Sequence, residues 1–113
     1  MESAASRILW GKVVNAGQTC VAPDYILVPR SFQDTLVDAL KKKYQEFYPG
    51  EEGAKKDDAY SRIVTKQAWG RIKGLLDGTK GNVVLGGEVD EEGKYIAPTI
   101  VKDVPGDDSL MSE

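Results

Sequence analysis

The only cysteine of this chain, Cys20, is the side chain best suited to nucleophilic chemistry. It ends the run Asn15-Ala16-Gly17-Gln18-Thr19-Cys20, which follows an amphipathic segment and precedes an apolar stretch at residues 25–28. Gly17 can adopt the left-handed conformation that ends a helix, because it has no Cβ. Pro23 favours an extended exit from the turn. The pattern predicts a thiol on a short connection between a helix and a strand, where reactive groups are commonly found.

The chain contains no histidine, and this absence limits what the thiol can do. Cys-His and Ser-His-Asp nucleophile pairs are excluded within this chain. With a single cysteine, the usual zinc sites are excluded as well. A nucleophilic Cys20 would therefore need a different base. Without further context, a lone cysteine is more often a small buried hydrophobic residue.

Three other features could suggest ligand sites, but each lacks the required spacing. Gly86-Gly87 follows an apolar run, yet no helix with a Gly-x-x-Gly pattern comes next. The carboxylates at positions 90–92 lack the spacing of a calcium loop, so we expect no metal site. The lysines at positions 41–43 suit a solvated helix face. Asn15 is expected to help close the turn before Cys20.

Length, composition and charge are those of an ordinary soluble globular chain. The 113 residues allow at most one domain, and 41% hydrophobic with 29% charged residues argue against wholesale disorder. A net charge of −3 argues against nucleic acid and anionic membranes as main partners. No apolar run approaches the length of a membrane span, and the N-terminus lacks a signal-peptide pattern. Since one cysteine cannot form an internal disulfide, we expect a cytoplasmic location.

The first half of the chain is expected to form two helices around a strand. Residues 2–15 have helical apolar spacing, with Ser3 as N-cap and Trp10 among the packing residues. Residues 25–28 are apolar on both faces, which favours a buried strand of a parallel sheet. Ser31 is expected to cap a second helix, with Asp34 in the capping-box position. The apolar face of that helix comprises Phe32, Leu36, Val37, Leu40, Tyr44 and Phe47.

The second half is expected to form a helix followed by two strands. Thr65 is the predicted N-cap, Trp69 lies on the core face, and Gly78 is the stop. Strands at 83–85 and 95–101 are close enough to pair antiparallel, with an edge or a bulge at Pro98. The order helix-strand-helix-helix-strand-strand predicts an α/β fold whose sheet is incomplete on its own. We interpret it as a piece of a larger α/β domain.

The residues around the thiol resemble the active-site cysteine signature of aldehyde dehydrogenases. The match comprises Val13, Gly17-Gln18, Cys20, Val21-Ala22 and Asp24. Further stretches resemble the class 3, or fatty-aldehyde, branch: Arg7-Ile8-Leu9-Trp10-Gly11-Lys12, Tyr60-Ser61-Arg62-Ile63-Val64, and Gly86-Gly87 followed by Tyr95-Ile96-Ala97-Pro98-Thr99-Ile100. The resemblance covers essentially the whole chain, which predicts that residues 1–113 are part of the catalytic domain of that family.

The resemblance implies a role for Cys20 and shows which other parts are missing. Cys20 would attack an aldehyde carbonyl, its backbone N–H would be one oxyanion-hole donor, and NAD or NADP would accept hydride from the thiohemiacetal. The general-base glutamate, the second oxyanion donor and the cofactor domain have no counterpart here, so no cofactor-binding residue is predicted. Glu113 would precede the family's ribose-binding glutamate, and no role is transferred to it. The implied substrates are medium-chain, long-chain or aromatic aldehydes, and the parent enzyme would be a homo-oligomer.

Two other kinds of function remain open from the sequence. The chain could be a non-catalytic module descended from such an enzyme, associating through unpaired strands. It could also hold a redox-sensing or inert thiol. Because one nucleophile without base, second donor or cofactor site lacks large contributions to catalysis, we expect the isolated chain to be inactive. Substrate chain length, the choice between NAD and NADP, and the oligomeric state do not follow from the sequence.

Overall fold

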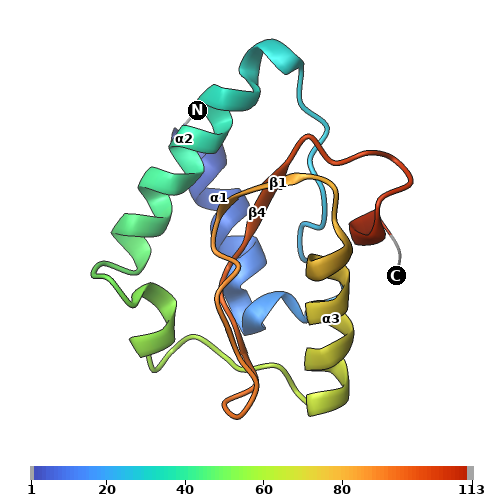
Figure 1. The fold of residues 1–113 in the computed structure, drawn as a ribbon. Helices are drawn as coiled ribbons and strands as arrows, with labels where there is room; N and C mark the ends of the chain where they lie inside the picture. The colour runs from blue at the N-terminus through green and yellow to red at the C-terminus, as the bar shows by residue number, and fades with distance from the viewer. Residues whose placement is uncertain (1, 112–113) are drawn as a thin grey trace. The chain divides into compact units, whose positions relative to one another are not determined.

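The chain divides into two units, one up to Ser61 and one from Arg62 onwards, in a computed structural model that describes residues 2–111. The first unit is helical, and the second combines α3 with short antiparallel strands (Figure 1). This mixture of helices and strands agrees with the predicted α/β class. Glu113 lies outside the described residues.

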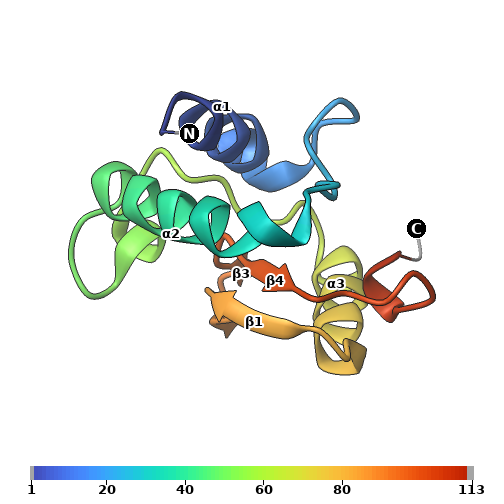
Figure 2. The same cartoon turned by 90° about the horizontal axis from the view of Figure 1, so that it is seen from above.

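Helices α1 (Glu2–Val13) and α2 (Arg30–Phe47) pack side by side in the first unit (Figure 2). Two short 3-10 segments follow them, η1 (Val14–Gly17) and η2 (Gly53–Lys56). The two long helices bury apolar side chains spaced three and four residues apart, as the sequence predicts. These are Ala5, Leu9, Val13, Leu36, Val37 and Leu40.

The predicted N-caps of both helices are wrong. Helix α1 begins at Glu2, as its predicted range 2–15 has it, so Ser3 lies inside its first turn and is not its cap. Helix α2 begins at Arg30, directly after Pro29, whose φ of −58° and ψ of 140° make it the last extended residue. Ser31 is therefore a first-turn residue, and α2 has no side-chain cap at Pro29.

Two aromatic side chains expected in the core are instead exposed. Trp10 is 64% exposed, because one residue after the buried Leu9 the helix has turned by about 100°. Phe32 is 52% exposed and lies in the first turn of α2, before the buried stretch that begins at Leu36.

Residues 25–28 do not form the predicted buried strand. The segment 23–29 is irregular, and Tyr25, Ile26 and Leu27 are 61%, 42% and 89% exposed. A strand needs a hydrogen-bonded neighbour, and the four strands among residues 2–111 pair with one another. The apolar run is thus left without a ladder in the described part of the chain.

In the second unit, α3 (Lys66–Gly78) begins and ends where the sequence predicts. The hydroxyl of Thr65 accepts a hydrogen bond from the Ala68 backbone N–H at 3.0 Å, which satisfies one free donor of the first turn. Trp69 is buried, and its indole N–H donates to the Tyr95 carbonyl at 3.0 Å. This bond joins α3 to strand β3.

The strands form two antiparallel pairs instead of one. Strand β1 (Asn82–Leu85) pairs with β4 (Ile100–Lys102), and β2 (Val89–Asp90) pairs with β3 (Tyr95–Ile96). The predicted strand 95–101 is interrupted at residues 97–99, around Pro98, which cannot donate to a ladder. The predicted antiparallel pairing of this region is otherwise confirmed, with a register irregularity in β1.

Gly86 allows its own segment to approach the backbone of Pro98 and Thr99 closely. Its φ is +82°, and a Cβ there would collide with the Pro98 carbonyl and lie 2.8 Å from Thr99 Cα. The neighbouring Gly87 N–H donates to the Thr99 hydroxyl at 3.0 Å. The space at Gly86 is therefore taken by the protein's own backbone.

A buried carboxylate holds the end of the second unit. Asp108 accepts hydrogen bonds from the Thr79 hydroxyl at 2.6 Å, the Lys80 backbone N–H at 2.7 Å and the Leu110 backbone N–H at 3.1 Å. The Thr79 and Lys80 hydrogen bonds lower the pKa of Asp108 below its usual value. The carboxylate joins the segment after α3 to η3 (Ser109–Met111).

Candidate active site

The chain reverses its handedness immediately before the thiol. Asn15, Ala16 and Gly17 have φ values of 54°, 53° and 77°, so three successive residues are left-handed. The left-handed Gly17 was predicted. Asn15 tolerates this region better than most residues, but Ala16 is strained there. Strained backbone of this kind persists only where surrounding contacts hold it, and it is concentrated at functional sites.

Gln18 stabilises this left-handed turn at its first residue. Its backbone N–H and its side-chain amide both donate to the Asn15 carbonyl, at 3.1 Å and 2.9 Å. The predicted role of Asn15 in closing the turn is confirmed, although its carbonyl and not its side chain accepts these bonds. Sequence reasoning did not identify Gln18 as the donor, because a glutamine in a loop has many possible partners.

Cys20 lies in the next turn and its side chain is exposed. The Ala22 N–H donates to the Thr19 carbonyl at 2.9 Å, which closes a tight turn around Cys20 and Val21. Because the free thiol is exposed, Cys20 is not the buried hydrophobic residue that a lone cysteine often is. The predicted helix precedes it, but an irregular segment, and not a strand, follows it.

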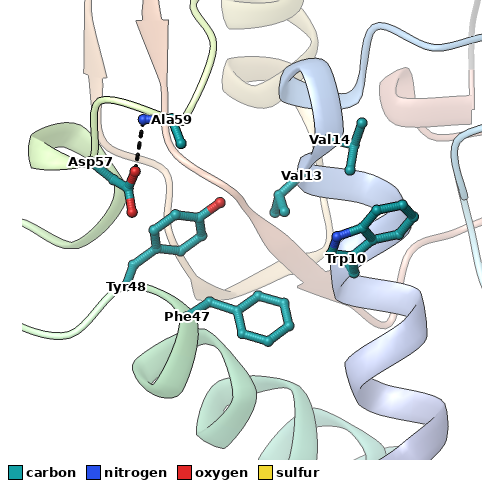
Figure 3. A pocket seen from close by; sticks show the side chains of 7 residues that line it. All are labelled: Trp10, Val13, Val14, Phe47, Tyr48, Asp57 and Ala59. Atoms are coloured by element: carbon teal, nitrogen blue, oxygen red, sulfur yellow. Dashed lines mark hydrogen bonds between the residues drawn. The ribbon is translucent and has the colours of Figure 1, made fainter.

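An open groove of about 370 Å³ lies in the same unit, at the C-terminal ends of α1 and α2 (Figure 3). Its walls are mostly apolar and aromatic, with one carboxylate. Asp57 accepts a hydrogen bond from the Ala59 N–H at 2.8 Å. Burial, the charge of Asp57 and the neighbouring Tyr44 raise the pKa of Tyr48. The groove is lined by Trp10, Val13, Val14, Phe47, Tyr48, Asp57 and Ala59.

The groove was not predicted, because Trp10 was assigned to the core. The signal that could have revealed it is the length of the apolar pattern in residues 2–15: Leu9, Trp10, Val13 and Val14 cover more of the helix than one partner helix can bury. Leu9 and Val13 are buried, whereas Trp10 and Val14 are exposed. Of these four, Trp10, Val13 and Val14 line the groove (Figure 3).

The described residues supply few of the other groups that a cysteine enzyme needs. Residues 2–111 contain no group of three or more carboxylate or cysteine side chains placed to hold a metal ion. They also form no glycine-rich loop leading into a helix N-terminus, the usual arrangement for holding a dinucleotide phosphate.

In this part of the chain, no helix is both long and apolar enough to cross a membrane.

Comparison with known proteins places these features in a family. The sequence profile of the aldehyde dehydrogenase family matches residues 1–113. The chain belongs to the aldehyde dehydrogenase family. Within this family it is 49% identical over 113 residues to the bovine enzyme named "Aldehyde dehydrogenase, dimeric NADP-preferring", covering 100% of this chain and 46% of that protein. It is 45% identical over 113 residues to rat "Aldehyde dehydrogenase family 3 member A2", covering 100% of this chain and 22% of that protein.

The fold also matches a solved aldehyde dehydrogenase. The substrate-bound structure of Staphylococcus aureus AldH superposes with a TM-score of 0.92 at 43% identity, covering 99% of this chain and 24% of that one. The predicted resemblance to the aldehyde dehydrogenase family, including its family 3 members, is confirmed. The chain spans less than half the length of each of these three relatives.

Proposed function

We propose that Cys20 is the nucleophile of an aldehyde dehydrogenase that oxidises an aldehyde to a carboxylic acid with NAD or NADP as hydride acceptor. The observation that supports this most strongly is the exposed thiol on a tight turn, in a chain that matches the family over residues 1–113. In this proposal, residues 1–113 are part of one catalytic domain. The remaining machinery is supplied by polypeptide outside this chain.

The proposed chemistry at Cys20 begins with addition to the carbonyl. The thiolate sulfur forms a bond to the carbonyl carbon, and the π electron pair moves onto oxygen. The backbone N–H of Cys20 is proposed as one donor to the resulting oxyanion, since it meets charge that develops only as the carbonyl rehybridises. The thiol proton must go to a base, and the chain has no histidine to take it.

The cofactor is proposed to be held outside the described residues. Gly86, in the single adjacent glycine pair Gly86-Gly87, lies close to Pro98 and Thr99 of the same unit. With the cofactor held elsewhere, this chain is proposed to contribute to the hydride-transfer step by holding the substrate on Cys20. For the same reason we propose that the chain by itself does not turn over aldehyde.

The substrate is proposed to be an apolar aldehyde of medium or long chain, or an aromatic one. Trp10 and Val14 lie one turn apart on the helical segment that leads to Cys20, and they are 64% and 39% exposed. Exposed apolar side chains on the segment that leads to a reactive group favour hydrocarbon over charged substrates. A homo-oligomeric parent enzyme and a cytoplasmic location complete the proposal.

Substitution of the thiol in the full-length protein tests the proposal. Cys20→Ala and Cys20→Ser should lower NAD(P)H formation from an aliphatic aldehyde by at least about a thousandfold, as for other covalent nucleophiles. Thr19→Ala, next to the thiol and also exposed, is the matched control and should retain activity. Turnover by Cys20→Ala at a rate near that of the control would refute the role of Cys20. Rapid thiol oxidation without aldehyde turnover in the wild type would favour the redox-sensing alternative.

A further inference from the structure

We propose that Lys12 is a positioning residue, whose aliphatic stem holds the left-handed turn that presents Cys20. Lys12 is in the last turn of α1, five positions before Gly17. A methyl group on Gly17 would lie 3.2 Å from Lys12 Cε, 3.3 Å from the Lys12 carbonyl oxygen and 3.5 Å from Lys12 Nζ. The end of the lysine side chain therefore lies directly over the Gly17 backbone. The inference rests on the proposed function of Cys20.

The turn needs such a contact because its backbone is strained. Three successive left-handed residues, of which Ala16 has a side chain that disfavours this conformation, persist only when neighbouring groups restrict them. The side-chain amide of Gln18 restricts the turn at the Asn15 carbonyl. Lys12 covers the other end of the turn, at Gly17, and this is the end nearer to Cys20 in the chain.

The methylene stem, and not the charge, is inferred to do this. Lys12 is an exposed residue, and both Cε and Nζ lie near Gly17, so the charge at this site is open to solvent and the adjoining methylene supplies the apolar contact. A screened surface charge contributes little to local order. An unbranched apolar side chain of similar length should therefore replace Lys12, and a truncated one should not.

The test compares Lys12→Ala with Lys12→Met in the full-length enzyme, with Arg7→Ala as the control. Arg7 is exposed on the same helix, away from the turn. Misplacement of a reacting group by about 1 Å can cost up to a hundredfold in rate. We expect Lys12→Ala to lower kcat and the rate of Cys20 alkylation by iodoacetamide at least about tenfold, with the KM for NAD(P)+ and the unfolding midpoint equal to those of Arg7→Ala. Lys12→Met should recover both rates to within about threefold of wild type.

Each outcome decides the inference. The inference is overturned if Lys12→Ala has the same rates as Arg7→Ala. It is also overturned if Lys12→Met has rates as low as those of Lys12→Ala, because the charge of Lys12 would then matter. If Lys12→Ala does not fold, Lys12→Met and Lys12→Gln decide: both lose the charge, and only the longer apolar stem should keep activity. Activity that survives in Cys20→Ala refutes the proposed function, whereas Cys20-dependent activity unaffected by Lys12→Ala refutes only the role of Lys12.

Discussion

Replacing Trp69 by phenylalanine should destabilise the second unit locally. The indole N–H is a buried donor to the Tyr95 carbonyl at 3.0 Å, and phenylalanine removes it while keeping a ring. Loss of a partner from a buried acceptor costs about 1–3 kcal/mol. The smaller ring costs about 1 kcal/mol more in packing. The expected total of about 2–4 kcal/mol corresponds to about a 30- to 1,000-fold larger equilibrium constant for local opening.

Hydrogen–deuterium exchange of the full-length protein measures this opening directly. Peptides that cover α3 and β3 should lose protection in Trp69→Phe. Trp10→Phe provides a matched control, because Trp10 is 64% exposed and its ring therefore contributes little to the packing of a core. The control should change opening by less than about 0.5 kcal/mol. Equal exchange of the β3 amides in the two variants would show that the indole hydrogen bond does not hold α3 to β3.

Three further substitutions test separate features of the second unit. Thr65→Ala should lower the free energy of unfolding by about 1 kcal/mol through loss of the helix cap, while Thr65→Ser should not; equal stabilities by urea denaturation would contradict the cap. Gly86→Ala should lower the free energy of unfolding by at least about 2 kcal/mol, because of the positive φ of Gly86 and the nearby Pro98 carbonyl. Gly74→Ala in α3, with open space around it, should instead raise the free energy of unfolding by about 0.5–1 kcal/mol. Shifts of the same sign in the thermal unfolding of the two variants would be inconsistent with this. Hydrogen bonds lower the folded-state pKa of Asp108. Its contribution to the stability of the fold is therefore present above the unfolded-state pKa of about 4, and it is lost as pH falls through the lower folded-state pKa. Asp108→Asn should therefore reduce the acid dependence of stability below about pH 4, and an unchanged acid limb would exclude this carboxylate as a cause.

Local chemistry made the second unit the more predictable one. The cap at Thr65, the stop at Gly78 and the buried Trp69 all follow from short-range patterns within one helix. The interruption at Pro98 was also foreseen, since proline cannot donate to a ladder. The separate β2–β3 hairpin was not, because two-residue strands have too little pattern to be recognised in a sequence.

Position within the tertiary structure decided the features that sequence reasoning got wrong. Trp10 and Trp69 have equivalent helical spacing, but only Trp69 meets a strand carbonyl and is buried. Residues 25–28 have the composition of a buried strand, yet Tyr25, Ile26 and Leu27 are exposed, and no described strand pairs with this segment. Hydrophobic periodicity states which face needs a partner, and it does not state whether a partner is there.

The sequence by itself determined the family, the single candidate nucleophile and the left-handed Gly17, because these depend on residue type at fixed spacing along the chain. Only the tertiary structure decided that Asn15 and Ala16 are left-handed as well, that Gln18 donates twice to the Asn15 carbonyl, and that Lys12 lies over Gly17. Those features depend on distances between groups several residues apart, and such distances follow from how the backbone turns in space.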